Sequence, residues 1–295
     1  MTGAVAGPVQ VEWTSRDTLL YAVAIGVGSA DALTGLKYTT ENSSGVGQEV
    51  LGTYAAVIAQ NAALPRDLGN VDPSNVLHAG QELRIMRELP AAGVISVRQA
   101  TTALYDKGSG ALAVIESVGR DPGDGAIVFT SKNLSFIRGA GGFGGDRGPR
   151  DTWVRPERSP DHVTTLATAA NQALIYRLCG DRNPLHSDPA FAAAAGFPRP
   201  ILHGLATMGV VVRAVGELAG IPGTLARREI RARFARPVTP GDTLTVRAWS
   251  DGDRVLFDAA LESGLVALTH GVVGLIGADP TADHQTALVE PVPVW

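Results

Sequence analysis

Two diverged copies of one pattern make up the chain, and this duplication constrains the fold more than any other feature. A helix-like run at residues 16–26 has a counterpart at residues 171–180. A second apolar helical run follows in each copy, at residues 53–63 and 205–219. Such a unit buries its apolar face when an antiparallel sheet wraps around the helix. We therefore expect an α+β protein with two repeats, each with a long helix wrapped by an antiparallel sheet.

Strands and turns also follow in the same succession in both copies. Tyr21 and Tyr176 hold matching positions in the first helical runs. After the second run, each copy has a strand, a turn with Pro and Gly, another strand and a hairpin-like pair. The expected strands cover residues 81–86, 94–103, 230–235 and 243–249, with hairpin turns at 106–110 and 250–253. The expected units are an N-terminal repeat at 1–137, a glycine-rich linker at 138–160 and a C-terminal repeat at 161–295.

The glycine-rich segment contains Gly-Gly-Phe-Gly-Gly at residues 141–145. A dinucleotide fingerprint needs a strand before its glycines, a helix after them and an acidic residue about 20 positions later. Charged and proline-rich sequence follows instead, at residues 147–158. We interpret the segment as a linker or lid and not as a phosphate cradle.

Composition sets the broad class. With 45% hydrophobic and 18% charged residues, the chain is typical of a globular protein with a substantial core. A net charge of −4 argues against nucleic acid as a partner. Cys179 is the single cysteine, which suits a reducing compartment. No apolar run is long enough to span a bilayer, residues 1–10 do not resemble a signal peptide, and arginine greatly outnumbers lysine. We expect a protein of the bacterial cytoplasm.

The richest local pattern begins at Tyr176 and ends at Pro189. Its helical run stops at Gly180, so Asp181 opens a loop. Asn183 and the proline after it stiffen a turn before His186. Acid–base chemistry needs a carboxylate and an imidazole preset within hydrogen-bond reach. The alternative interpretation is structural, because Asp and Asn at such positions are usually caps and a single His is usually a structural residue.

A second pattern follows at His203-Gly204, which we expect to begin an apolar helix that runs towards Gly220. The first N–H groups of a helix have no partner within it. They can stabilise an oxyanion, and Gly204 lets a ligand approach the backbone closely.

Together these strings resemble a known family. Tyr-Arg-Leu-Cys-Gly-Asp-x-Asn-Pro-Leu-His at 176–186, Ala-Gly-Phe at 195–197 and Pro-Ile-Leu-His-Gly-Leu at 200–205 resemble the hydratase 2 motif of the MaoC-like (R)-specific enoyl-CoA hydratases. The resemblance implies a double hot-dog fold of the eukaryotic hydratase 2 type. Residues 26–35, in the first copy, lack the Asp-x-Asn-Pro-x-His string. The C-terminal repeat is therefore expected to be catalytic and the N-terminal repeat to be a binding half with room for an acyl chain.

The resemblance also implies a reaction, the syn addition of water to a trans-2-enoyl-CoA to give the (3R)-3-hydroxyacyl-CoA. Asp181 and His186 would hold the water and transfer its proton, Asn183 would orient them, and the N–H of Gly204 would polarise the thioester carbonyl. The division of acid and base roles between Asp181 and His186 stays open. No cofactor is implied, since coenzyme A is part of the substrate. The histidines show no metal-ligand spacing, so we also expect no metal.

Four further residues are candidates for substrate binding. His78, Lys107 and Phe234 match family positions that contact the acyl-CoA, where a Lys can pair with phosphates and a Phe can pack on adenine. A solvated turn Lys and a core Phe are the structural alternatives. Ala79 departs from the family's His-Gly-Glu-Gln string, which leaves the acyl chain-length preference open. Glu41 lies in a matching string but has the character of a surface carboxylate.

Two other functions remain open. One is a (3R)-hydroxyacyl-thioester dehydratase of fatty-acid synthesis that acts on carrier-protein substrates through the same site. The other is a non-catalytic hot-dog module that binds acyl thioesters, although such a module has no need of both Asp181 and His186. A homodimer is possible, and the physiological direction and pathway are not specified by the residues.

Overall fold

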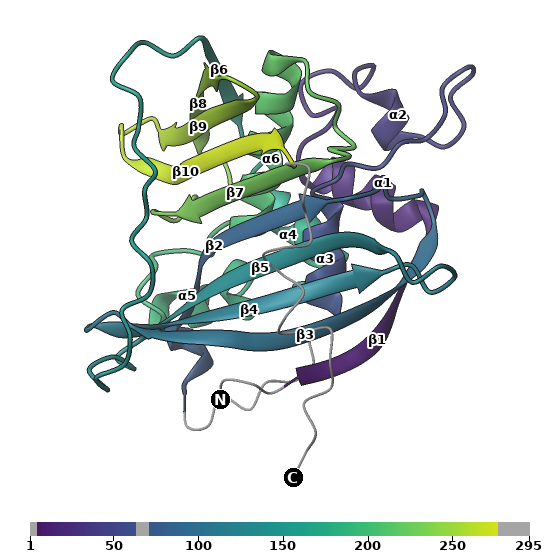
Figure 1. Ribbon diagram of the computed structural model, residues 1–295. Coiled ribbons are helices and arrows are strands. Elements are labelled where there is room, and N and C mark those ends of the chain that lie inside the picture. Colours follow the sequence, from purple (N-terminus) through teal and green to yellow (C-terminus); the bar gives the residue numbers. More distant parts are fainter. Residues whose placement is uncertain (1–4, 63–70, 277–295) are drawn as a thin grey trace.

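We describe the protein from a computed structural model that covers residues 5–62 and 71–276. Within these ranges, ten strands form one antiparallel sheet in the order β1-β3-β4-β5-β2-β7-β10-β9-β8-β6 (Figure 1). The strands are β1 (Val5–Trp13), β2 (Val76–Ile85), β3 (Gly93–Asp106), β4 (Gly110–Arg120), β5 (Ile127–Arg138), β6 (His162–Ala167), β7 (Arg228–Phe234), β8 (Thr243–Asp251), β9 (Arg254–Leu261) and β10 (Val266–Leu275).

The sheet consists of two halves with the same internal order. β1-β3-β4-β5-β2 in the first half corresponds to β6-β8-β9-β10-β7 in the second, strand for strand along the chain. The halves join where β2 pairs with β7, with Leu83 opposite Ile230. Both side chains are almost fully buried, so the join is part of the core. The predicted strands, hairpins and double hot-dog architecture are confirmed.

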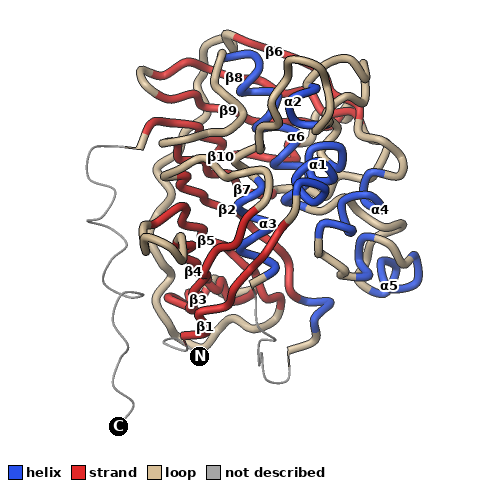
Figure 2. Tube along the Cα trace, turned by 90° about the vertical axis from the view of Figure 1, so that its right-hand side faces the viewer, coloured by secondary structure: helices blue, strands red, loops and turns tan. Residues whose placement is uncertain are grey.

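Helices cover one face of the sheet (Figure 2). α3 packs on the first half and the longer α6 on the second. Nearly every residue of α6 up to Gly216 is buried, because this helix is apolar on almost all sides. The helices are α1 (Ser15–Ala24), α2 (Leu36–Thr39), α3 (Tyr54–Asn61), α4 (Gln172–Tyr176), α5 (Pro189–Ala194) and α6 (Gly204–Ala219), with 3-10 turns at Pro73–Asn75, Arg177–Cys179 and Pro184–His186.

The two copies share one core. α1 packs against α4, and the matching tyrosines of the repeat, Tyr21 and Tyr176, meet there with ring centroids 6.2 Å apart. The hydroxyl of Tyr21 donates to Thr53 just before α3. One cluster of buried apolar side chains extends from Val11 in β1 to Val273 in β10. The halves therefore stabilise each other as parts of a single folded unit.

The segment between Arg138 and His162 contains no helix or strand, and in Figure 1 it passes alongside the sheet from the first half to the second. The carboxylate of Asp106, the last residue of β3, accepts hydrogen bonds from the backbone of Gly142 and Gly144. Farther on, the indole of Trp153 donates to the backbone of β10. The expected repeat boundaries stay a prediction, and residues 277–295 of the expected C-terminal repeat lie outside the described ranges. No helix described here is long and apolar enough to cross a membrane.

Gly209 provides a test of this packing. A Cβ atom there would lie 2.9 Å from the side chain of Ile25 and 3.0 Å from the hydroxyl of Tyr21, so α6 and α1 touch only because the side chain is absent. We expect Gly209→Val to lower the free energy of unfolding by about 1–3 kcal/mol, since overpacking outweighs the gain in helix propensity. Urea unfolding followed by circular dichroism measures the change.

Glu217→Val is the matched control, because it places the same branched side chain on the exposed part of α6. It breaks only the ion pair with Arg213 and should cost less than about 1 kcal/mol. Equal losses in the two variants would contradict the packing argument.

Candidate active site

The predicted catalytic loop follows the 3-10 turn that ends at Cys179, and hydrogen bonds to its own side chains hold it. The Asp181 side chain accepts a hydrogen bond from the Asn183 N–H at 3.1 Å, and the Asn183 side chain accepts one from Leu185 at 3.0 Å. Gly180 has a φ of 132°, which favours glycine, and a Cβ there would lie 2.0 Å from the Asn61 side chain. The chain can therefore turn sharply at this point and bring Asp181 up against α3.

His186 follows two residues after Pro184 and is 8% exposed. Its Nδ1 lies 2.9 Å from the carbonyl oxygen of Ile201. A carbonyl oxygen can only accept, so Nδ1 carries the proton and the Nε2 lone pair remains available. This tautomer lets the imidazole accept a proton at Nε2.

His203, the residue just before α6, contacts both Asp181 and His186. Its ring stacks on that of His186, with centroids 3.7 Å apart, and lies 4.8 Å from the ring of Tyr176. Its Nε2 lies 3.4 Å from the backbone carbonyl of Asp181. It is 1% exposed, and its Nδ1 has no hydrogen-bond partner among the described residues. His203 thus holds both Asp181 and His186 in place.

Gln60 was not predicted from the sequence. It lies near the end of α3, in the first half of the chain, and its amide donates to Asp181 Oδ2 at 2.8 Å. The available signal was a pair of amide side chains, Gln60 and Asn61, at the end of an otherwise apolar helical run. The carboxylate therefore receives hydrogen bonds from both halves of the molecule.

Burial and nearby polar groups determine the charges of Asp181, His186 and His203. Burial acts to raise the pKa of Asp181, but the nearby His203 ring and the bond from Gln60 outweigh it, and the pKa falls below its usual value. Burial lowers the pKa of His186. Burial, reinforced by the adjacent His186, lowers the pKa of His203 to about 3. At neutral pH the site thus holds one carboxylate and two neutral imidazoles.

Asp181, His186 and Gln60 line a cavity of about 880 Å³ between the helices and the sheet. Gly204 lies in its wall, with the Phe234 ring about 3.2 Å from where a Cβ would be. As the first residue of α6, Gly204 has an N–H without an intrahelical acceptor. The predicted residues that line the cavity are Asp181, Asn183, His186, Gly204, His78, Ala79 and Phe234.

The structure brings most of the predicted substrate-binding residues together, with one exception. The rings of His78 and Phe234 meet edge to face, with centroids 4.8 Å apart, across the β2–β7 join. Lys107 does not line the cavity; it lies over the Tyr105 ring and donates to the backbone of Arg147 in the inter-repeat segment. Its contact with the substrate stays a prediction. Glu41 is exposed and is also not in the cavity wall.

Asp181, His186 and His203 each offer an atom that could ligate a metal, all within 4.8 Å of one another. The two imidazoles are stacked with an angle of 27° between their planes. The lone pairs of two stacked imidazoles lie in nearly parallel ring planes and point past each other. The ligands of a metal ion, in contrast, all point at the ion. The expectation of a metal-free site stays a prediction, and this geometry favours it.

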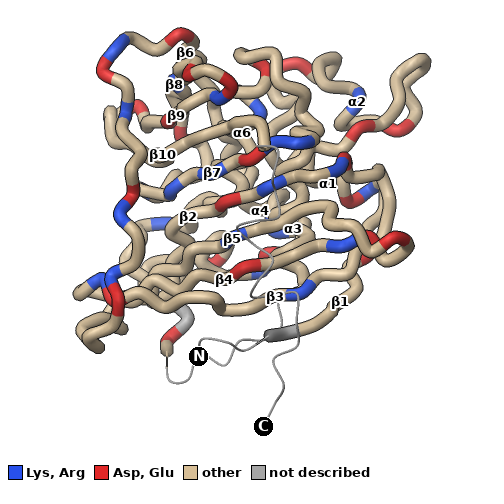
Figure 3. Tube along the Cα trace, viewed as in Figure 1, with Lys and Arg blue, Asp and Glu red and all other residues tan. Residues whose placement is uncertain are grey.

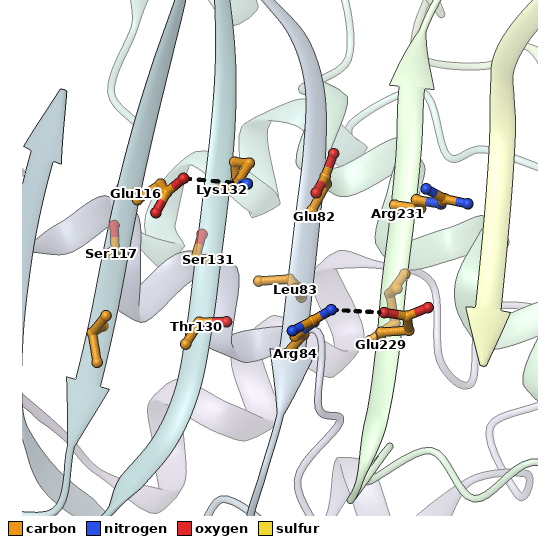
Figure 4. Close-up of a pocket in the computed structure, with 12 residues that line it drawn as sticks. Glu82, Leu83, Arg84, Glu116, Ser117, Thr130, Ser131, Lys132, Glu229 and Arg231 are labelled. Atoms are coloured by element: carbon orange, nitrogen blue, oxygen red, sulfur yellow. Dashed lines mark ion pairs between the residues drawn. The ribbon is translucent and has the colours of Figure 1, made fainter. Parts of the chain in front are cut away.

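A smaller groove of about 110 Å³ lies on the opposite face of the sheet (Figure 4). Acidic and basic residues from neighbouring strands meet on this face (Figure 3), including Glu116 with Lys132 at 3.2 Å and Arg84 with Glu229 at 3.5 Å. These opposite charges are paired at a solvent-facing surface, where ion pairs contribute little. We regard the groove as part of the outer surface and not as the reaction site.

The buried histidines make stability depend on pH. The unfolded chain binds protons as the pH falls below the usual histidine pKa of 6.5, whereas folded His203 resists protonation until about pH 3. The stabilisation is therefore complete above pH 6.5 and is lost as the pH falls. We expect urea unfolding of His203→Gln, between about pH 7 and pH 4, to show a slope shallower than wild type by up to about 1.4 kcal/mol per pH unit. An unchanged slope would contradict this assignment.

Known proteins resemble both halves of this chain in sequence. Residues 11–139 match the MFE-2 hydratase 2 N-terminal domain and residues 152–270 the MaoC like domain. The 3-hydroxyacyl-thioester dehydratase Y of Mycobacterium tuberculosis is 47% identical over 84% of this chain and 85% of its own length. Enoyl-CoA hydratase ChsH3 of the same species is 41% identical, over 86% and 89%. A crystal structure of a MaoC-like dehydratase from Phytophthora capsici matches with a TM-score of 0.79 at 31% identity, over 92% of this chain and 94% of that one. The chain belongs to the MaoC-like hydratase and dehydratase family, with a hydratase 2 N-terminal half.

Proposed function

We propose that the protein catalyses the reversible addition of water to trans-2-enoyl-CoA, giving (3R)-3-hydroxyacyl-CoA. One observation carries this proposal: the Asp181 carboxylate and the His186 imidazole, which can accept at Nε2, lie together in a cavity beside the first N–H of α6. The names of the two mycobacterial relatives, a thioester dehydratase and an enoyl-CoA hydratase, support the same reaction class.

The two side chains suit the binding of one water molecule. At neutral pH both Asp181 and His186 Nε2 are acceptors, so a water between them donates one hydrogen to each and turns its oxygen lone pair towards the substrate. C3 of an enoyl thioester is electrophilic because its double bond is conjugated with the carbonyl. As the water oxygen bonds to C3, the pair takes the water proton and returns a proton to C2. The net change breaks one O–H bond of water and the π bond between C2 and C3, and it forms one C–O bond at C3 and one C–H bond at C2.

Both new bonds form on the face of the substrate that is turned towards the pair, so the addition is syn. Electron density moves onto the thioester oxygen during the step. The Gly204 N–H, at the positive end of α6, is the donor that would stabilise this developing charge. One such donor is worth on the order of 3 kcal/mol of barrier. How Asp181 and His186 divide the acid and base roles stays open.

In this proposal the first half provides binding and orientation without a catalytic pair of its own. Gln60 fixes the carboxylate, and His78 and Ala79 form part of the cavity wall. Arg138 and Arg236 are exposed residues of the same wall and suit the anionic phosphates of coenzyme A. Asn183 shapes the catalytic loop through its bond to Leu185, which supports a positioning role.

The same site could dehydrate 3-hydroxyacyl thioesters carried by an acyl carrier protein. Competition between coenzyme A and carrier-protein thioesters would separate these functions. The proposed reaction uses no cofactor and no metal, because the conjugated thioester is already electrophilic. We also propose a bacterial cytoplasmic location and a homodimer; the mycobacterial relatives support only the bacterial part of this proposal.

Replacing either member of the pair tests the proposal. With crotonyl-CoA and a longer trans-2-enoyl-CoA, loss of the enoyl-thioester absorbance reports turnover, and a 3R-specific dehydrogenase captures the product. We expect Asp181→Asn and His186→Ala to lower kcat by about a hundredfold or more, since each removes a proton-transfer group.

Asp188→Asn is the matched control, because Asp188 lies in the same loop and only caps α5, a role that asparagine also fills. Its activity should equal that of wild type. Folded Asp181→Asn and His186→Ala proteins that retain full activity would refute the assigned pair.

A further inference from the structure

The part of the cavity that lies in the first half has a polar wall. The inner face of a sheet that packs against helices is normally apolar. Here, however, a continuous row of amide and hydroxyl side chains crosses adjacent strands: Gln99 in β3 is paired with Ser117 in β4, which is paired with Ser131 in β5. We call the following residues the polar belt, and all of them line the cavity: Gln81, Gln99, Ser117, Ser131, Asn133 and Ser135.

The belt is buried and internally ordered. Gln99 donates to Ser117 at 3.0 Å, and Gln81 donates to Ser131 at 2.7 Å. Apart from the half-buried Asn133, every member is at most 8% exposed. In the described part of the chain, no group donates to the side-chain carbonyl oxygen of Gln81 or Gln99. The belt therefore retains acceptors for a ligand that enters the cavity.

The polar belt is connected to Asp181 through the end of α3. Gln99 donates to the backbone carbonyl of Ala59, and the next residue of α3 is Gln60, which binds Asp181. An acyl chain that places its double bond at Asp181 and His186 and extends into the first half would therefore meet the belt beyond the reacting carbons.

A plain hydrocarbon chain is a poor partner for this surface. It would displace water from buried amides and hydroxyls without replacing the lost hydrogen bonds, which is costly. A chain with its own hydroxyl or carbonyl oxygen would replace them. Sites built to bind a hydroxyl can strongly reject analogues that lack it.

We propose that the polar belt selects acyl groups with a hydrogen-bonding oxygen beyond the reacting double bond over plain chains of equal length. The proposal rests on the proposed function for the placement of the acyl thioester, and it adds the chemical class of the acyl group. The substrate is then an oxygenated acyl-CoA and not a simple fatty acyl-CoA.

Binding of saturated acyl-CoAs tests the belt without turnover. Calorimetry with wild-type protein would compare hexanoyl-, octanoyl- and decanoyl-CoA with their terminally hydroxylated forms. We expect the hydroxylated ligand to bind about tenfold more tightly at one or more lengths. In the double variant Ser117→Ala/Ser131→Ala this preference should largely disappear. If the double variant does not fold, Ser117→Ala alone is measured, and it should reduce the preference. Thr130→Ala, beside Ser131 but not in the cavity wall, should leave it unchanged.

The outcomes separate the two proposals. Tighter binding of the plain chain at every length, an unchanged preference in the belt variants, or no binding of either ligand would overturn the role of the belt. Turnover of crotonyl-CoA, whose acyl group is short, tests the hydratase reaction separately. Loss of that turnover with an intact binding preference would refute only the proposed function.

Discussion

The catalytic arrangement depends on how one buried carboxylate is held. Asp181 receives a hydrogen bond from Gln60 in the first half and another from Asn183 in its own loop, and the His203 ring lies against its backbone. Burial alone would favour the neutral acid, which could not accept a proton from water. The surrounding donors keep it ionised, and this requires α3 and α6 to pack on the same continuous sheet. The join between β2 and β7 is thus a condition for the chemistry.

The two halves share an architecture but differ at the catalytic loop. Both copies retain the same strand order, and Tyr21 and Tyr176 still meet where α1 packs on α4. The second copy retains the Asp–His loop and the long α6. In the first copy, α3 is shorter and the inner face of the sheet is open to the cavity. In our proposal this volume receives the acyl group, and the side chains that line it select which acyl group is accepted.

Much of the fold and of the catalytic loop could be predicted from the sequence, because residues close together in the chain determine where these elements begin and end. Gly180 and Pro184 specify the ends of the catalytic loop, and the apolar run up to Gly220 specifies α6. Gln60 could not be predicted, since its partner is far away in the chain and only tertiary packing brings them together. The polar belt was also missed, because scattered Ser, Asn and Gln residues in strands do not reveal which sheet face they occupy. For Lys107, the sequence string predicts a contact with the substrate. The structure shows its hydrogen bond to the inter-repeat segment, and the substrate contact stays a prediction.

Hydration of crotonyl-CoA in deuterated water tests the central claim most directly, because one water molecule held by Asp181 and His186 can add only to one face of the double bond. NMR of the captured product would determine the configuration at C3 and at the deuterated C2. The account predicts a single diastereomer with 3R configuration, in which oxygen and deuterium were added to the same face. A 3S product, anti addition or a mixture at C2 would contradict it.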